Sequence, residues 1–149
     1  MRIHHFFVFL ACALLAGCES VSDGFATVPP QIQTVEGSPE KVYLAAQQAF
    51  KRLDFVLTRS SMGRVEAASR IRTSETFGNS KQLVARLEIH EAEPGKSSVE
   101  LWVTEETASE SMGGTRKQPL RENGFFSLYF AMLQQVLKER ADEPLTRKN

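Results

Sequence analysis

The sequence predicts an α+β domain in which two helices pack on one face of a four-stranded antiparallel sheet. Three observations lead to this fold class. The first and last segments of the domain have apolar residues at the spacing of an amphipathic helix. Four segments lie between them, and three of these alternate apolar and polar residues, as half-buried strands do. The connections between these segments are short, which favours an antiparallel meander in the order α-β-β-β-β-α.

Length and charge limit the architecture and the class of partner. The chain has 149 residues, with 18 basic and 18 acidic side chains, and 42% of its residues are hydrophobic. This length fits one globular domain. A protein that binds nucleic acid generally through its phosphates carries an excess of basic residues. The formal net charge of zero therefore argues against a nucleic-acid partner.

Residues 1–17 have the order of a bacterial export signal. Arg2 supplies a positive start, and residues 6–16 form an unbroken apolar run of eleven residues. A membrane-spanning helix needs about 20 such residues, whereas the apolar part of a signal peptide needs roughly 7 to 15. We therefore expect a cleaved signal peptide.

The apolar run ends in a short motif, Leu15-Ala16-Gly17-Cys18. This motif resembles the lipobox of bacterial lipoproteins. The resemblance implies that the signal peptidase cuts between Gly17 and Cys18, and that the Cys18 thiol carries a diacylglyceryl group. It also implies that the new amino terminus receives a fatty acyl chain such as palmitate. A single fatty chain anchors a protein only marginally, so several chains on Cys18 would hold this protein on a membrane.

The residue after the lipidated cysteine bears on which membrane holds the protein. In enteric lipoproteins, an aspartate at this position retains the protein at the inner membrane. This chain has Glu19 instead. By resemblance, we expect a lipid-anchored protein on the periplasmic face of the outer membrane.

Residues 18–37 are predicted to be the lipidated amino terminus and a flexible tether. Gly24, the Pro29-Pro30 pair and Gly37 interrupt any helical or strand period. Phe25 and Val28 are apolar and could pack on the domain, which would order part of the tether.

The globular domain is expected over residues 38–140 and begins with a helix at 39–53. Ser38-Pro39-Glu40 combines a capping hydroxyl, a proline at the first helical position and an acid in the first turn. Strands are predicted at 54–59, 64–72, 83–90 and 99–104. Their alternation gives the sheet one dry face and one wetter face.

The rest of the domain is predicted as a loop and a second helix. Residues 106–118 are polar and contain a Gly-Gly pair, so we expect a long loop. The second helix is placed at 119–140, with an apolar stripe that runs from Phe125 to Leu137. Residues 141–149 form a charged tail.

The predicted organisation resembles known envelope proteins. A tethered α/β domain of this order is similar to several small periplasmic lipoproteins of unassigned function. Its element order is also similar to that of the helix-grip domains in a lipoprotein subunit of the outer-membrane β-barrel assembly machinery. These resemblances imply a role in the cell envelope.

The residues available for chemistry are few. Cys12 would leave with the signal peptide and Cys18 would carry lipid, so the mature chain would have no free thiol. His90 is the one histidine that remains, and it falls on the wetter strand face, where a solvated side chain is the simplest interpretation. No zinc-protease, serine-hydrolase or nucleotide-binding motif occurs. We therefore expect no catalysis, no cofactor and no metal site.

Trp102 is the most informative residue of the domain. The alternation of its strand places the indole on the wetter face, with Arg70 and Arg86 on neighbouring strands. An aromatic residue framed by arginines is typical of an interface hot spot. Alternatively, Trp102 covers the sheet by stacking on the arginine stems, or the long loop at 106–118 hides it. The candidate interaction surface consists of Trp102, Arg70, Arg86 and His90.

Two functions follow from these features. In the first, the domain is a protein-interaction or accessory module with a partner in the cell envelope. In the second, it binds a small apolar ligand or lipid in a cavity between the helices and the sheet. Alanines and mid-sized aliphatic residues predict a filled core, which favours the first.

Overall fold

The computed structural model describes residues 28–74, 79–109 and 114–142. The predicted signal peptide, Cys18, the first part of the tether and residues 143–149 lie outside these ranges. Within them the chain forms nine elements: β1 (Gln31–Glu36), α2 (Pro39–Arg52), β2 (Phe55–Ser61), β3 (Arg64–Ser69), β4 (Arg72–Thr73), β5 (Asn79–Glu93), β6 (Lys96–Ser109), β7 (Gly114–Pro119) and α3 (Gly124–Asp142).

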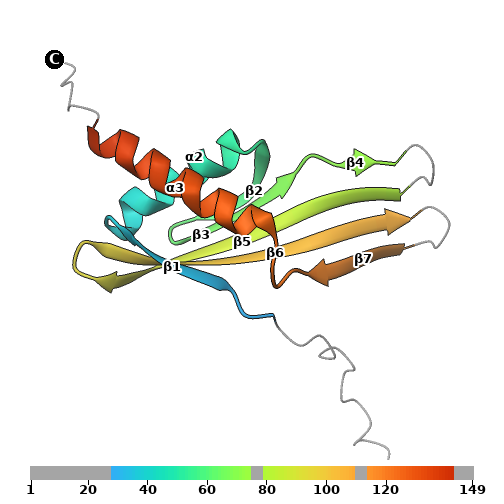
Figure 1. The fold of residues 1–149 in the computed structure, drawn as a ribbon, viewed down its shortest axis with the longest axis horizontal. Helices are drawn as coiled ribbons and strands as arrows, with labels where there is room; N and C mark the ends of the chain where they lie inside the picture. The colour runs from blue at the N-terminus through green and yellow to red at the C-terminus, as the bar shows by residue number, and fades with distance from the viewer. Residues whose placement is uncertain (1–27, 75–78, 110–113, 143–149) are drawn as a thin grey trace, which may run out of the picture.

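The fold is a mixed α/β layer structure with two helices on one side of an antiparallel sheet (Figure 1). The predicted fold class is therefore confirmed at this level. The predicted number of strands is wrong, because the sheet of the described residues has seven strands rather than four. Three of them, β1, β4 and β7, lie in segments where the sequence pattern predicted no separate strand.

The sheet is built around the hairpin of β5 and β6. Its order is β1-β6-β5-β3-β2, with β4 pairing to β5 and β7 pairing to β6. β1 lies opposite residues 96–101 of β6, and β7 lies opposite residues 104–109 of the same strand. Because the other edge of β6 pairs with β5, β1 and β7 lie end to end along one edge.

The two long strands of the hairpin extend past the helices. β5 and β6 have 15 and 14 residues and meet at a turn where Gly95 has φ +79°, a conformation that favours glycine. Figure 1 shows β4, β7 and the adjoining parts of β5 and β6 beyond the end of the helix layer. Because no helix covers this part of the sheet, neither face of its strands has to be apolar. The sequence of this part therefore lacks the alternation of apolar and polar residues that predicted the strands beneath the helices.

The first helix agrees with its prediction. α2 spans Pro39–Arg52, and it starts with proline, whose missing N–H costs nothing at this position. The Ser38 side chain makes no capping hydrogen bond, contrary to the role we gave it. Three alanines and two larger apolar residues face the sheet; the buried set is Val42, Ala45, Ala46, Ala49 and Phe50.

The second helix begins later than predicted. α3 spans Gly124–Asp142, because Pro119 ends β7 instead of opening a helix. The Asn123 side-chain oxygen accepts a hydrogen bond from the Phe125 N–H at 2.9 Å, which satisfies one of the free donors at the helix start. Tyr129 is fully buried, and the centroid of its ring lies 4.4 Å from the ring centroid of Phe50 on α2.

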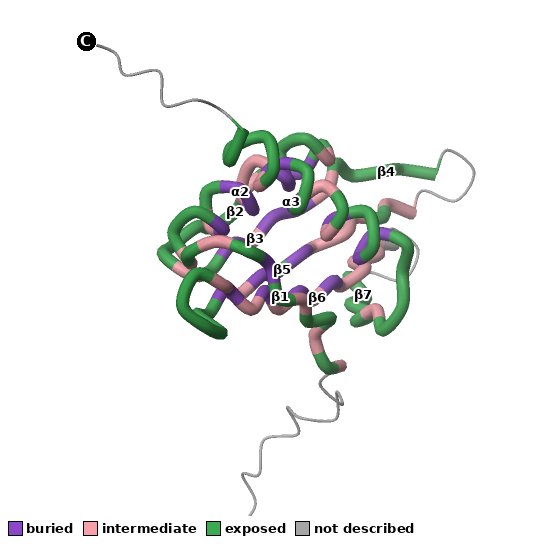
Figure 2. The backbone as a smooth tube through the Cα atoms, turned by 60° about the vertical axis from the view of Figure 1, so that its left-hand side comes forward, coloured by how far each residue is buried: buried purple, intermediate pink, exposed green. Residues whose placement is uncertain are grey.

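The core lies between the helices and the sheet (Figure 2). Burial of the fully enclosed Tyr129 raises the pKa of its phenol well above the ordinary value. The sheet contributes side chains from one face only, as the alternation predicted. These buried sheet residues are Val35, Phe55, Val65, Ala67, Ala85, Leu87, Ile89, Val99, Leu101 and Val103.

The predicted tether is partly a strand. Residues 31–36 form β1, and Val35 is only 5% exposed. The Gly37 N–H donates to the Gly95 carbonyl at 2.8 Å, and the buried Ser97 hydroxyl donates to the Gly37 carbonyl at 2.8 Å. These contacts fix the end of β1 to the β5–β6 turn. The ordered domain therefore includes residues that the sequence pattern assigned to the linker.

The predicted loop at 106–118 is also wrong. β6 continues to Ser109, and residues 114–119 form β7, an edge strand whose residues are all exposed. Backbone hydrogen bonds to β6 can hold such a strand without a buried side chain, so its polar sequence gave no strand signal.

No helix in the described ranges is long and apolar enough to cross a membrane.

Candidate functional site

The candidate site lies on the outer face of the sheet, the face that points away from the helices. The register places Arg86 of β5 opposite Glu66 of β3 on one side and opposite Trp102 of β6 on the other. Trp102 is half-buried, whereas its chain neighbours Leu101 and Val103 are buried on the helix side. The indole therefore occupies the wetter face, where the alternation placed it.

Arg86 packs against the indole. Its Cζ atom lies 5.0 Å from the centroid of the Trp102 ring, within the range of a cation–π contact. The sequence analysis offered an interface hot spot and stacking on an arginine stem as alternatives. The observed stacking is compatible with both, because an arginine above an aromatic ring still leaves the other edges of the indole accessible.

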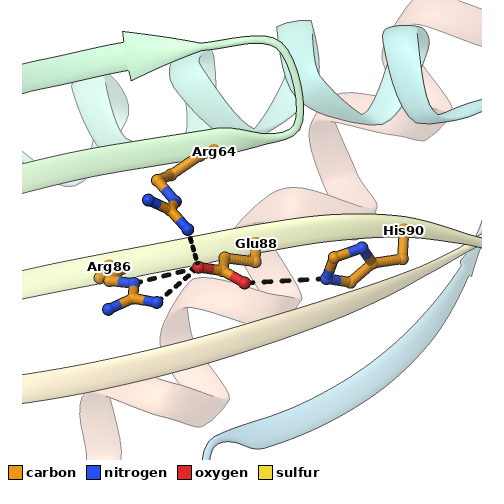
Figure 3. Close-up of polar contacts among 4 residues, drawn as sticks. All are labelled: Arg64, Arg86, Glu88 and His90. Atoms are coloured by element: carbon orange, nitrogen blue, oxygen red, sulfur yellow. Dashed lines mark hydrogen bonds and ion pairs between the residues drawn. The ribbon is translucent and has the colours of Figure 1, made fainter.

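Arg86 is held in place by an ion-pair cluster centred on Glu88 (Figure 3). One carboxylate oxygen of Glu88 accepts from Arg86 Nη2 at 2.5 Å and from Arg64 Nη2 at 2.7 Å. The hydrogen bond from Arg86, together with the charges of both guanidinium groups, lowers the pKa of Glu88 below its ordinary value. The Glu88 side chain is 16% exposed, so this charge-assisted contact is partly shielded from water.

His90 is the outermost member of this cluster. Its Nε2 atom lies 3.8 Å from the second Glu88 oxygen, and its side chain is 57% exposed. Among the described residues, no group of histidine, aspartate and glutamate side chains is arranged to hold a metal ion. His90 thus lies on the predicted surface as a solvated side chain beside a carboxylate.

Arg70 lies elsewhere. Its guanidinium Nε is 2.9 Å from Asp54 Oδ2, and both side chains are largely exposed. β3 ends at Ser69, so Arg70 does not continue the alternation that would have brought it toward the indole. The structure therefore brings Trp102, Arg86 and His90 onto one face, with Arg86 and His90 joined through Glu88, and leaves Arg70 outside this group.

A groove opens beside the indole. It has a volume of about 390 Å³, and its apolar lining includes Val28, Pro29, Val84, Trp102, Pro119 and Leu120. The rim is charged and includes Arg86 and an ion pair between Lys117 and Glu106, with Nζ and Oε1 2.8 Å apart. We call this feature the Trp102 groove.

The position of the groove follows from the end-to-end arrangement of β1 and β7. Both strands stop pairing with β6 beside Trp102 and Val103. The first residue of β1, Gln31, pairs with Leu101, and the last residue of β7, Pro119, pairs with Thr104. Pro29 and Pro30 precede β1 and Pro119 ends β7, and none of them has an N–H that could extend the ladder. The Leu120 N–H closes the gap with one bond to the Val103 carbonyl at 2.8 Å.

Sequence reasoning missed the walls of the groove. Val28, Pro119 and Leu120 were assigned to a tether, a helix start and a helix, and none was a candidate for binding. The prolines were a usable signal, because a proline at a strand end marks the place where pairing stops.

A second cavity of about 360 Å³ lies between α3 and β1. Three glutamines, Gln31, Gln33 and Gln134, line it together with Phe126 and Phe130. Its amide-rich lining offers hydrogen bonds rather than a continuous apolar wall.

No family model matches this chain, and no curated protein matches its sequence. Solved structures of the adenylate sensor from AMP-activated protein kinase resemble its fold. The complex with ZMP is 17% identical with a TM-score of 0.42, over 71% of this chain and 94% of that one. The complex with ATP is 19% identical with a TM-score of 0.43, over 70% of this chain and 92% of that one.

Proposed function

We propose that this protein is a lipoprotein, anchored through Cys18 on the periplasmic face of the outer membrane, and that its domain binds a protein partner through the Trp102 groove. The anchor is supported by the resemblance of residues 15–18 to a lipobox after an apolar run. The binding role is supported by the composition of the groove, described next.

One observation carries the binding role. A half-buried tryptophan lies beside an apolar groove of about 390 Å³ whose rim holds charged side chains. Protein interfaces have this arrangement of an aromatic centre inside a polar rim, and tryptophan and arginine are enriched among their hot spots. Arg86 is held in position by Glu88, so it would lose little conformational freedom on binding.

Replacing Trp102 with alanine should weaken partner binding and leave the stability of the domain nearly unchanged. The indole lies outside the core, so the core packing of β6 persists without it. A photo-crosslinker at Lys117 on the groove rim tests this in intact envelopes. The crosslinked product formed by the wild-type chain should be lost from the Trp102→Ala chain, with little change in melting temperature.

Ile32 provides a matched control for this experiment. It is an exposed apolar residue on the same outer face, 61% exposed, and it does not line the groove. Ile32→Ala should leave the Lys117 crosslink intact. If Trp102→Ala also leaves it intact, the groove is not the binding surface. A large fall in melting temperature would instead show that Trp102 is a structural residue.

Replacing Cys18 with serine should abolish lipid attachment. Serine has no thiol to accept the diacylglyceryl group, so the precursor should remain uncut and metabolic labelling with fatty acids should disappear. Cys12→Ser is the matched control, because Cys12 lies inside the apolar run, and it should leave labelling unchanged. Labelling that persists in the Cys18→Ser chain would refute the anchor.

The alternative function, binding of a small apolar ligand between the helices and the sheet, has less support. The side chains in that layer are packed as one cluster with exposures of 0 to 8%. The cavity beside it, between α3 and β1, has three glutamines and a serine among its lining residues. Both features favour the protein-binding proposal over a lipid cavity.

A further inference from the structure

We propose that the Trp102 groove is occupied by the chain's own tether, with Phe25 packed against the indole. Residues 19–27 of the tether lie outside the residues that the structure describes. This inference concerns an intramolecular contact and does not depend on lipid attachment or on an external partner.

The groove and the tether are contiguous along the chain. Val28 and Pro29, the first residues that the structure describes, already form one wall of the groove. The tether is therefore covalently connected to the groove at Val28. No other terminal segment outside the described residues has its connection there, because residues 143–149 continue from the far end of α3 (Figure 1).

Phe25 is the side chain with the right reach and chemistry. It lies three positions before Val28 along the chain, and an extended chain covers at most about 3.6 Å per residue, so their Cα atoms lie within about 11 Å. Phe25 is the only aromatic residue in the tether. A phenylalanine buries roughly 150 to 250 Å² of surface in a good site, and aromatic pairs pack favourably.

Covalent attachment favours this occupant over a second copy of the chain. A segment tethered at the groove wall has an effective concentration in the millimolar range, which a separate molecule at ordinary protein concentrations cannot match. Gly24 and Ser22 lie one and three positions before Phe25, and both residue types are common in turns. An external partner that binds the same groove would have to displace Phe25.

The chain offers a direct spectroscopic test, because Trp102 is its only tryptophan. Indole emission moves to longer wavelength and is quenched more strongly by acrylamide when the ring becomes exposed to water. In the full mature chain in detergent, Phe25→Ala should shift the emission to longer wavelength and increase quenching. Val21→Ala, four residues earlier in the tether, is the matched control and should change neither.

Three results would overturn the proposal. The first is an unchanged Trp102 emission in the Phe25→Ala chain, and the second is an equal shift in the Val21→Ala chain. The third is an emission that depends on protein concentration, which would show that a second copy fills the groove. A shift specific to Phe25→Ala, independent of concentration and with the melting transition of the domain retained, supports it.

Discussion

Replacing Leu87 with alanine is expected to lower the free energy of unfolding by about 2 to 5 kcal/mol, the range of buried leucine truncations. Leu87 is fully buried in the central strand β5. It lies opposite Val65 on β3 and Leu101 on β6, and both of these are also fully buried. A cavity at this point borders two other strands, and the long hairpin limits how far the backbone can relax to fill it.

Denaturant unfolding of the variant measures this loss. Leu44→Ala is the matched control, because Leu44 is 45% exposed on α2 and should cost much less than Leu87. Equal losses for the two variants would contradict the assignment of Leu87 to the centre of the core. An unchanged denaturant slope is expected, since both variants should unfold the same surface.

Removing β1 is expected to have the second large effect. A fragment of residues 38–142 should be less stable than a fragment of residues 28–142 by at least about 2 kcal/mol. Burial of Val35 contributes roughly 1.5 to 3 kcal/mol, and the two hydrogen bonds at Gly37 contribute about 1 kcal/mol each. The open edge of β6 should also make the shorter fragment prone to aggregate.

Thermal unfolding of the two fragments measures how much β1 stabilises the domain. The longer fragment should show a cooperative transition, and the shorter one should melt at a lower temperature. A Val35→Ser variant of the longer fragment separates side-chain burial from strand pairing, because it keeps the backbone ladder. If both fragments melt at the same temperature, β1 contributes nothing to the domain and the tether extends to residue 37, as the sequence pattern predicted.

The covered part of the fold could be predicted because burial leaves a periodic signal. The helix at 39–53 and the alternation around Leu87 and Leu101 were visible because one face of each element meets the core. β1 and β7 left no such signal. Their residues are mostly exposed, and backbone hydrogen bonds to β6 hold both strands in place. Almost any sequence can supply such backbone hydrogen bonds, so they leave no pattern of apolar residues.

The candidate site was predictable to the same extent. Strand period alone placed Trp102, Arg86 and His90 on one face. Arg70 was misplaced because β3 ends at Ser69, and period-two reasoning fails once a strand ends. The groove itself depends on where β1 and β7 meet along β6, and such a contact between distant segments leaves no local pattern.

The central position of the β5–β6 hairpin has a consequence for the order of folding. Its two strands are joined by a tight turn, so they can pair without closing a long loop, and isolated hairpins form in about 1 to 10 μs. The Ser97–Gly37 bond spans 60 residues, and the Tyr129–Ala46 bond spans 83. Contacts at such separations carry a larger loop-closure cost and form later.

The Trp102 groove takes its walls from Val28 and Pro119, on either side of this early hairpin in the sequence. The contact that brings Val28 to this groove is long-range, so the groove is incomplete until β1 has paired with β6.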